Sequence, residues 1–144
     1  MKLETQISIS ASPEKIWQIL TDFSQFPTWN PFLIKIMGNL KPNAHLLVLA
    51  RVPKFIFKFL PIVFHCQISE LKVNKELRWK GKLFHSSLFE GEHFFILENQ
   101  SETTVKFLHG EKYSGILRPL IVPLISSQKG FEMMNEELKK KSES

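Results

Sequence analysis

Four polar side chains in the second half of the chain have the types and spacing that could do chemistry: His93, His109, Glu111 and Tyr113. They fall on alternate positions that also carry large apolar residues, and alternate residues of a strand share one face. The four would therefore enter an apolar interior together. An unpaired polar group there costs about 1–3 kcal/mol, so each needs a partner from the protein or from a ligand.

This polar cluster admits three roles. The histidines and the carboxylate could pair with one another and lock the hairpin, orient the polar group of a ligand, or transfer protons. Catalysis would need a group with a shifted pKa within reach of a reacting atom, and no residues here resemble a nucleophile, base and orienting group in series. We therefore expect the four residues to orient a ligand without transforming it, and we assign no catalytic residue.

Six aromatic residues are further candidates for contact with a ligand. The tryptophans each have a second interpretation: Trp29 could plug a helical corner beside Asn30 instead of lying at a pocket mouth, and Trp79 could belong to the core or to a cavity wall. The phenylalanines are assigned to the same apolar faces as the polar cluster or to the last helix. They are Phe89, Phe95, Phe107 and Phe131.

No cofactor or metal motif is present. The six glycines form neither a phosphate loop nor a dinucleotide fingerprint, and no Gly-x-Ser-x-Gly elbow occurs. The five histidines lack the spacing of metal ligands. We therefore expect neither a cofactor nor a metal.

The composition favours a folded protein with an apolar interior. Apolar residues make up 43% of the 144 residues, and 13 residues are Phe. The net charge of +5 is spread along the chain, and the densest basic run, Lys139 to Lys141, lies among glutamates, which argues against nucleic-acid binding. Cys66 stands alone, and no stretch resembles a signal peptide or a spanning helix. We expect a soluble cytoplasmic protein.

The elements that must position these residues follow from hydrophobic periodicity. Alternation predicts seven strands, and Ser12-Pro13-Glu14 predicts the start of a helix that ends near Asp22. A short helical turn follows at 26–32, and residues recurring every three or four positions predict a long closing helix. The predicted strands are 3–9, 33–38, 46–52, 62–72, 77–82, 89–97 and 105–113.

The order of these elements predicts an α+β fold in which a curved antiparallel sheet of seven strands wraps around the C-terminal helix. Two short helices lie between the first two strands, and residues 1–144 form one domain. Only the last helix is long enough to cover the apolar face of the sheet. Its predicted contact stripe is Leu124, Phe131, Met134 and Leu138, while Pro119 and Pro123 leave its first residue open.

One apolar segment has two interpretations. Phe55, Phe57 and Phe59 alternate with Ile56 and Lys58, which is typical of a strand. If the segment from Phe55 to Phe64 were exposed, it would form a contiguous apolar patch, and such patches usually mark an interaction site. A partner protein is therefore an open alternative, and the sequence does not reveal the oligomeric state.

Several segments, in this order, resemble the START-like (SRPBCC, Bet v 1-like) superfamily, in its bacterial polyketide cyclase/dehydrase branch. They are Ile9 to Trp17, Trp29-Asn30-Pro31, Leu77 to Gly81, Phe89 to Phe95 and Glu111 to Gly115. The resemblance implies a helix-grip fold and an apolar small-molecule ligand such as a lipid, polyketide or isoprenoid, held by a carrier or sensor. It does not imply an activity, because folds of this kind host carriers, cyclases or dehydratases, and interaction domains.

Overall fold

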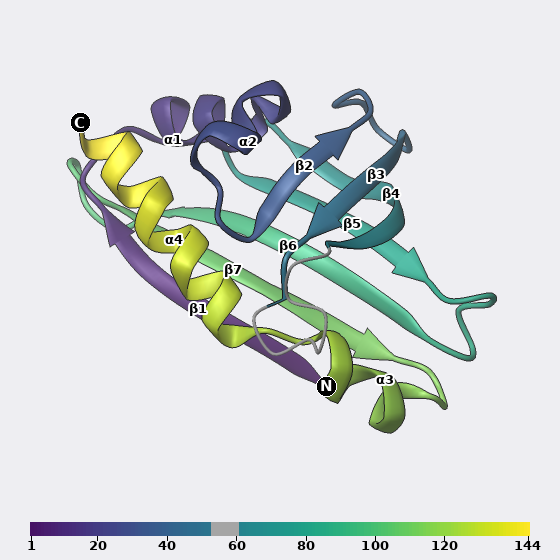
Figure 1. Cartoon of the computed structure of the whole chain (residues 1–144). Helices are drawn as coiled ribbons and strands as arrows, with labels where there is room; N and C mark the ends of the chain where they lie inside the picture. Colours follow the sequence, from purple (N-terminus) through teal and green to yellow (C-terminus); the bar gives the residue numbers. More distant parts are fainter. Residues whose placement is uncertain (53–60) are drawn as a thin grey trace.

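The computed structural model describes residues 1–52 and 61–144 and contains one curved antiparallel sheet (Figure 1). Its strand order is β1-β7-β6-β5-β4-β3-β2. The strands are β1 Lys2–Ile9, β2 Leu33–Met37, β3 His45–Ala50, β4 Ile62–Lys72, β5 Glu76–Lys82, β6 Glu90–Asn99 and β7 Val105–Ser114. The helices are α1 Pro13–Thr21, the 3-10 turn η1 Phe23–Gln25, α2 Phe26–Trp29, α3 Arg118–Ile125 and α4 Gln128–Glu143.

The seven predicted strands are confirmed, with ends that differ by two residues at most. The first and last strands are neighbours in the sheet, because β1 pairs with β7 along its whole length. The edge strands are therefore β1 and β2. Register shifts occur between Leu33 and Lys35 and between Ile68 and Glu70. Bulges of this kind bend and twist a strand, which helps the sheet to curl around its contents.

The first helix begins as the sequence predicts. The Ser12 side chain accepts a hydrogen bond from the Lys15 backbone N–H at 3.2 Å, and Pro13 occupies the first turn. Ile16, Trp17 and Leu20 form its buried stripe. The helix therefore packs into the core through one face.

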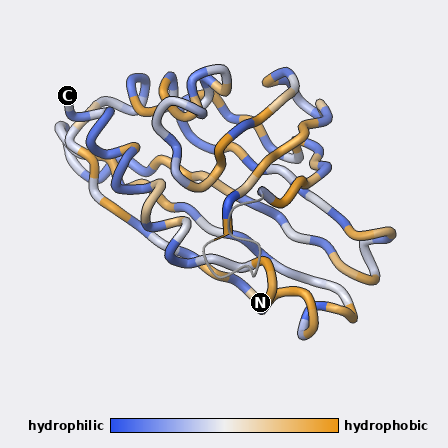
Figure 2. Tube along the Cα trace, viewed as in Figure 1, coloured by the Kyte–Doolittle hydropathy of each residue, from blue (hydrophilic) through white to orange (hydrophobic). Residues whose placement is uncertain are grey.

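The predicted long closing helix is confirmed as α4, and a separate short helix, α3, precedes it where the sequence left its first residue open. Ser126 is extended, and the Ser127 side chain caps α4 by accepting a hydrogen bond from the Gly130 N–H at 2.9 Å. The change of direction turns Leu124, a member of the predicted stripe, to solvent with 57% of its surface exposed. In Figure 2, α3 is mostly hydrophobic in colour, whereas α4 alternates along its length.

Helix α4 lies against β1 and β7 and also touches α1 (Figure 1). Phe131, Met134 and Leu138 form its buried stripe, as predicted. Gly130 allows α4 to lie close to Phe32, because a Cβ there would be 2.5 Å from the Phe32 ring. The C-terminal turn of α4 is held by Lys139, whose Nζ donates to the Ser8 carbonyl at 2.8 Å.

The alternation of Phe55, Phe57 and Phe59 lies outside the described residues. Phe64, at the end of the same predicted segment, belongs to β4 and is half-buried. None of the helices among residues 1–52 and 61–144 is both long and apolar enough to cross a membrane.

Candidate functional site

A cavity of about 350 Å³ lies between the inner face of the sheet and α3. Its walls are mainly apolar, and its polar groups are few. Strands β3 to β6 supply most of the wall, and Ile121 and Ile125 of α3 supply one end. The other lining residues are Phe32, Leu33, Val48, Ala50, Val52, Ile62, Val63, Phe64, His65, Cys66, Trp79, Gly81, Lys82, Leu83, Phe89, Gly91, His93 and Glu111.

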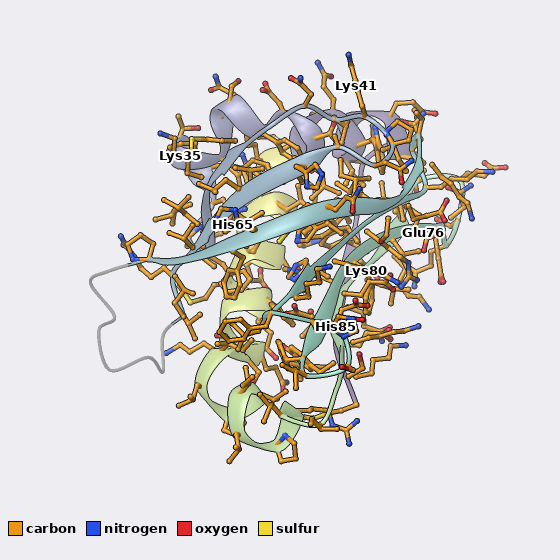
Figure 3. All side chains as sticks on the ribbon, turned by 90° about the vertical axis from the view of Figure 1, so that its right-hand side faces the viewer. Lys35, Lys41, His65, Glu76, Lys80 and His85 are labelled. Carbon is orange, nitrogen blue, oxygen red and sulfur yellow. The ribbon has the colours of Figure 1, made fainter. Side chains whose placement is uncertain are left out.

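Helix α3 is positioned by the β5–β6 loop. The backbone N–H groups of Ile116 and Leu117 donate to the carbonyls of Ser87 and Leu88, at 3.1 and 2.9 Å. Figure 3 shows this loop, which carries His85, beside the helix. Val122 packs with Phe89 and Tyr113, so α3 is anchored on one side while its isoleucines face the cavity.

Two groups give the cavity a polar end, His93 on β6 and Glu111 on β7. They are directly opposite in the β6–β7 register, so their side chains lie on the same face of the sheet. The distance from His93 Nδ1 to Glu111 Oε2 is 3.6 Å. Glu111 is the more accessible of the two, with 21% of its side chain exposed against 6% for His93.

Tyr113 bonds to the Glu111 carboxylate from outside the cavity lining. Its hydroxyl donates a hydrogen bond to Glu111 Oε2 at 3.0 Å. Burial, the negative charge of Glu111 and this hydrogen bond all raise the pKa of the phenol. Tyr113 therefore stays protonated and keeps donating to Glu111.

Cys66 is the one thiol of the chain, and it lines the cavity. Burial, with a smaller effect from the charge of Glu111, raises its pKa to about 12. The thiolate is the nucleophilic form of cysteine. At neutral pH Cys66 is therefore an apolar wall residue and a poor nucleophile.

Behind the cavity, a chain of hydrogen bonds joins His93 to three other elements. His93 Nε2 lies 2.8 Å from His109 Nε2, and His109 Nδ1 lies 2.9 Å from Asn135 Oδ1 on α4. Asn135 Nδ2 donates to Thr5 Oγ1 on β1, and the Thr5 hydroxyl donates to the His109 carbonyl, both at 2.9 Å.

The His109 backbone carbonyl, the last acceptor of the chain, determines which atom donates in each of these hydrogen bonds. A carbonyl oxygen only accepts, so the single hydroxyl proton of Thr5 is used there and its oxygen must accept from Asn135. The Asn135 carbonyl then faces His109, whose Nδ1 must carry the proton. In neutral His109, Nε2 is left as an acceptor, and His93 Nε2 must donate to it.

The surroundings of His109 keep it neutral. Complete burial is the main cause that lowers its pKa, and the neighbouring His93 lowers it further. Hydrogen bonds with Asn135 and with the Phe131 backbone carbonyl act in the opposite direction but are smaller. His93 consequently has its Nε2–H committed to His109, and only its Nδ1 faces Glu111.

The structure separates the ten predicted site residues into two groups. Trp79, Phe89, His93 and Glu111 line the cavity. The other six lie outside its lining: Trp29, Phe95, Phe107, His109, Tyr113 and Phe131.

The six residues outside the lining have structural neighbours that explain their placement. His109 is opposite Phe95, two residue pairs further along the hairpin and on the same face, where α4 covers the sheet. Phe131 packs on its imidazole, with ring centroids 4.5 Å apart, and Phe107 lies in the same core cluster. Trp29 packs edge-on against Phe26 at 5.3 Å in the helical corner.

Sequence reasoning missed two parts of the site. One is the wall formed by β3, β4 and α3, whose alternating apolar residues, such as Val48 and Ala50, were visible but not distinguishable from core. The other is Asn135, a polar residue four positions after Phe131 on the buried stripe of α4. Its place on an apolar helix face was the signal that could have revealed it.

The described residues contain no group of three His, Cys, Asp or Glu side chains that could hold a metal ion. The groups of the cavity with the chemistry for proton transfer are His93 and Glu111. Their atoms Nδ1 and Oε2 lie 3.6 Å apart, just beyond hydrogen-bond distance, so a small movement or one bridging water would be needed for a proton to pass between them.

Comparison with known proteins gives a family match over most of the chain. The family model described as polyketide cyclase / dehydrase and lipid transport matches residues 1–121. No curated protein sequence matches this chain.

Solved structures with the same fold come from bacteria and plants. A hypothetical protein from Helicobacter pylori matches with a TM-score of 0.74 and 17% identity, over 99% of this chain and 88% of its own. A START superfamily protein from Mycobacterium smegmatis has a TM-score of 0.71 and 17% identity, over 99% and 97%. Norcoclaurine synthase from Thalictrum flavum has a TM-score of 0.70 and 10% identity, over 97% and 92%. At these identities the likeness shows the fold, which is START-like and Bet v 1-like.

Proposed function

Since the chain belongs to the polyketide cyclase/dehydrase and lipid transport family, we propose that it binds one apolar small molecule in the cavity and serves as its carrier or sensor. The observation that carries this proposal is the cavity of about 350 Å³ with its mainly apolar wall. Small-molecule sites typically measure about 300–1,000 Å³ and combine apolar walls with a few polar groups that orient the ligand. His93 and Glu111 would be those groups, and residues 1–144 would act as one START-like unit.

Binding should be tested with Nile red, a neutral apolar dye. We expect its fluorescence to report about one site per folded chain, in the absence of added metal. Native mass spectrometry of the freshly purified protein should also detect a co-purified apolar molecule. Binding found only in unfolded protein would contradict the proposal.

A cavity-filling variant makes this test specific. Ala50 is a small residue of the cavity wall, so Ala50→Phe places an aromatic ring in the open space and should abolish Nile red binding while the protein stays folded. The matched control is Val73→Phe, at a position that is 67% exposed in the turn after β4. The control should bind the dye as the parent does. Undiminished binding by Ala50→Phe would place the dye outside the cavity.

A second candidate function is acid–base catalysis on a bound polyketide-like molecule, as in a cyclase or dehydratase. The observation that favours it is the approach of His93 to Glu111 at the cavity edge, where the pair could move a proton. Glu111→Gln separates the two functions, since loss of turnover with retained affinity would indicate catalysis. Loss of affinity with unchanged thermal stability would indicate ligand anchoring. A loss of stability alone, seen also in Glu111→Ala, would give Glu111 a structural role.

A further inference from the structure

We infer that the cavity selects apolar molecules that end in a hydrogen-bond donor, a hydroxyl or an amine, over apolar molecules that end in a carboxylate. This inference rests on the proposed function and specifies the ligand class of the same site. The basis is which hydrogen-bond donors and acceptors of the site already bond to other protein groups.

The donors at the polar end of the cavity are committed to protein groups. The Tyr113 hydroxyl proton goes to Glu111 Oε2, at 3.0 Å. The His93 Nε2–H goes to His109, whose other nitrogen donates to Asn135. Neither Tyr113 nor His109 lines the cavity.

The groups left facing the cavity at this end are acceptors. They are Nδ1 of His93 and the carboxylate of Glu111. Among the described residues, Glu111 Oε1 has no hydrogen-bond partner, whereas Oε2 receives the Tyr113 hydroxyl. A ligand that meets Oε1 should therefore bring its own donor.

Gly91 leaves the space that the Glu111 carboxylate occupies. It lies on β6 in the cavity lining, and a Cβ at this position would be 2.6 Å from Glu111 Oε1. That distance is too short for real Cβ contacts, so any larger residue would displace the carboxylate. The glycine thus permits the acceptor to lie over the strand beside the cavity.

The chemistry of the ligand follows from these groups. A hydroxyl or amine would donate to Glu111, and hydrogen bonds to a charged acceptor are stronger than those between neutral groups. A ligand carboxylate would place a second negative charge beside Glu111 and offer no donor. The alternative is a site for a ligand carboxylate. Its anion would be held by Lys82 and His65, two exposed residues that also line the cavity.

The test is displacement of Nile red by three molecules of nearly equal length, 1-decanol, 1-methoxynonane and decanoate, each below its aggregation limit at pH 7.5. The alcohol donates, the ether only accepts, and the carboxylate is an anion. We expect 1-decanol to bind about tenfold or more tightly than either of the others, the difference that about 1.4 kcal/mol gives. Equal or tighter binding of decanoate, with a further loss in Lys82→Gln, would overturn the inference in favour of an anion site.

Two variants test whether Glu111 causes the preference. Glu111→Gln removes the charge, and Gly91→Ala keeps the charge but moves the carboxylate. In each variant, the affinity for 1-decanol divided by the affinity for 1-methoxynonane should fall to about threefold or less, since the charged acceptor is lost or displaced. The control, Glu98→Gln, changes an exposed carboxylate of the same hairpin and should keep the full preference. If both variants keep the preference, Glu111 is not its source.

The two proposals fail in different ways. Absence of Nile red binding to the parent protein would refute the proposed binding function itself. Normal Nile red binding combined with no preference for the alcohol would leave that function intact and refute only the ligand class.

Discussion

At the scale of single residues, the most unusual feature is a histidine enclosed completely in the core. His109 lies between Phe95 and Phe131 and is joined by hydrogen bonds to His93 and Asn135. This arrangement links the hairpin to α4 and, through Thr5, to β1. The same residues orient the cavity-facing side of His93, so a structural network determines what the site can donate.

The enclosed histidine predicts that the protein is destabilised by mild acid. The pKa of His109 is low in the folded state, whereas an unfolded histidine has a pKa of about 6.5. As the pH falls below about 6.5, the unfolded chain takes up a proton that the folded chain does not, so the free energy of unfolding decreases by up to about 1.4 kcal/mol per pH unit. Melting temperatures measured from pH 7.5 to pH 5.5 should therefore fall.

A substitution identifies the histidine responsible. His109→Gln should be less stable at pH 7.5 and should show a shallower decrease toward pH 5.5. His85→Gln, in an exposed loop, should follow the parent at every pH. Parallel curves for the parent and His109→Gln would mean that another group causes the acid sensitivity.

At the scale of elements, the division of the C-terminal segment into α3 and α4 gives two helices with different tasks. Helix α4 closes the core with Phe131, Met134 and Leu138, all almost completely buried. Helix α3 supplies the end wall of the cavity with Ile121 and Ile125. One continuous helix could not perform both tasks, because its residues would follow a single line along the sheet.

This division predicts opposite effects for two members of the originally expected stripe. Phe131→Ala should lower the free energy of unfolding by about 3–5 kcal/mol, because it leaves a void in the packed core. Leu124→Ala should change it by no more than about 0.5 kcal/mol, because the side chain is already mostly exposed. Chemical denaturation of both variants measures the difference. Comparable losses would mean that Leu124 packs against the sheet after all.

At the scale of the whole molecule, the N-terminal strand β1 is bonded to two elements from the C-terminal part of the chain, β7 and α4. Strand β1 pairs with β7, and Lys139 near the C-terminus bonds to the Ser8 carbonyl. The residues that determine the site come from β1, β6, β7 and α4, so no part of the chain forms the polar end alone. Such long-range pairing requires loop closure before contacts can stabilise the structure.

The topology therefore predicts slow folding. Domains dominated by non-local strand pairs fold in about milliseconds to seconds, whereas helical bundles fold in about microseconds to milliseconds. Stopped-flow fluorescence can follow the buried Trp17 and Trp79. Double-jump experiments should remove any slow phase due to proline isomerisation, since the chain has 8 prolines. Completion within microseconds would contradict the prediction.

The sequence by itself determined the strands, the first helix and the fold class. Alternation located the strands, Ser12 and Pro13 located the first helix, and the order of the segments indicated the START-like family. These features are local, because the strand period and the helix caps are written in neighbouring residues. Period 2 also predicted that His93 and Glu111 lie on the same inward face, whereas their direct opposition follows from the register of β6 and β7.

Only the tertiary structure decided which members of the inward face meet open space and which meet other side chains. Phe95 and His109 share the face of His93 and Glu111, yet α4 covers the first pair and the cavity adjoins the second. The break at Ser126 and Ser127, and the choice of Asn135 as partner for His109, also depend on how α4 sits on the sheet. Alternation gives the side of the sheet on which a residue lies, but packing between distant segments decides whether that side is filled or open.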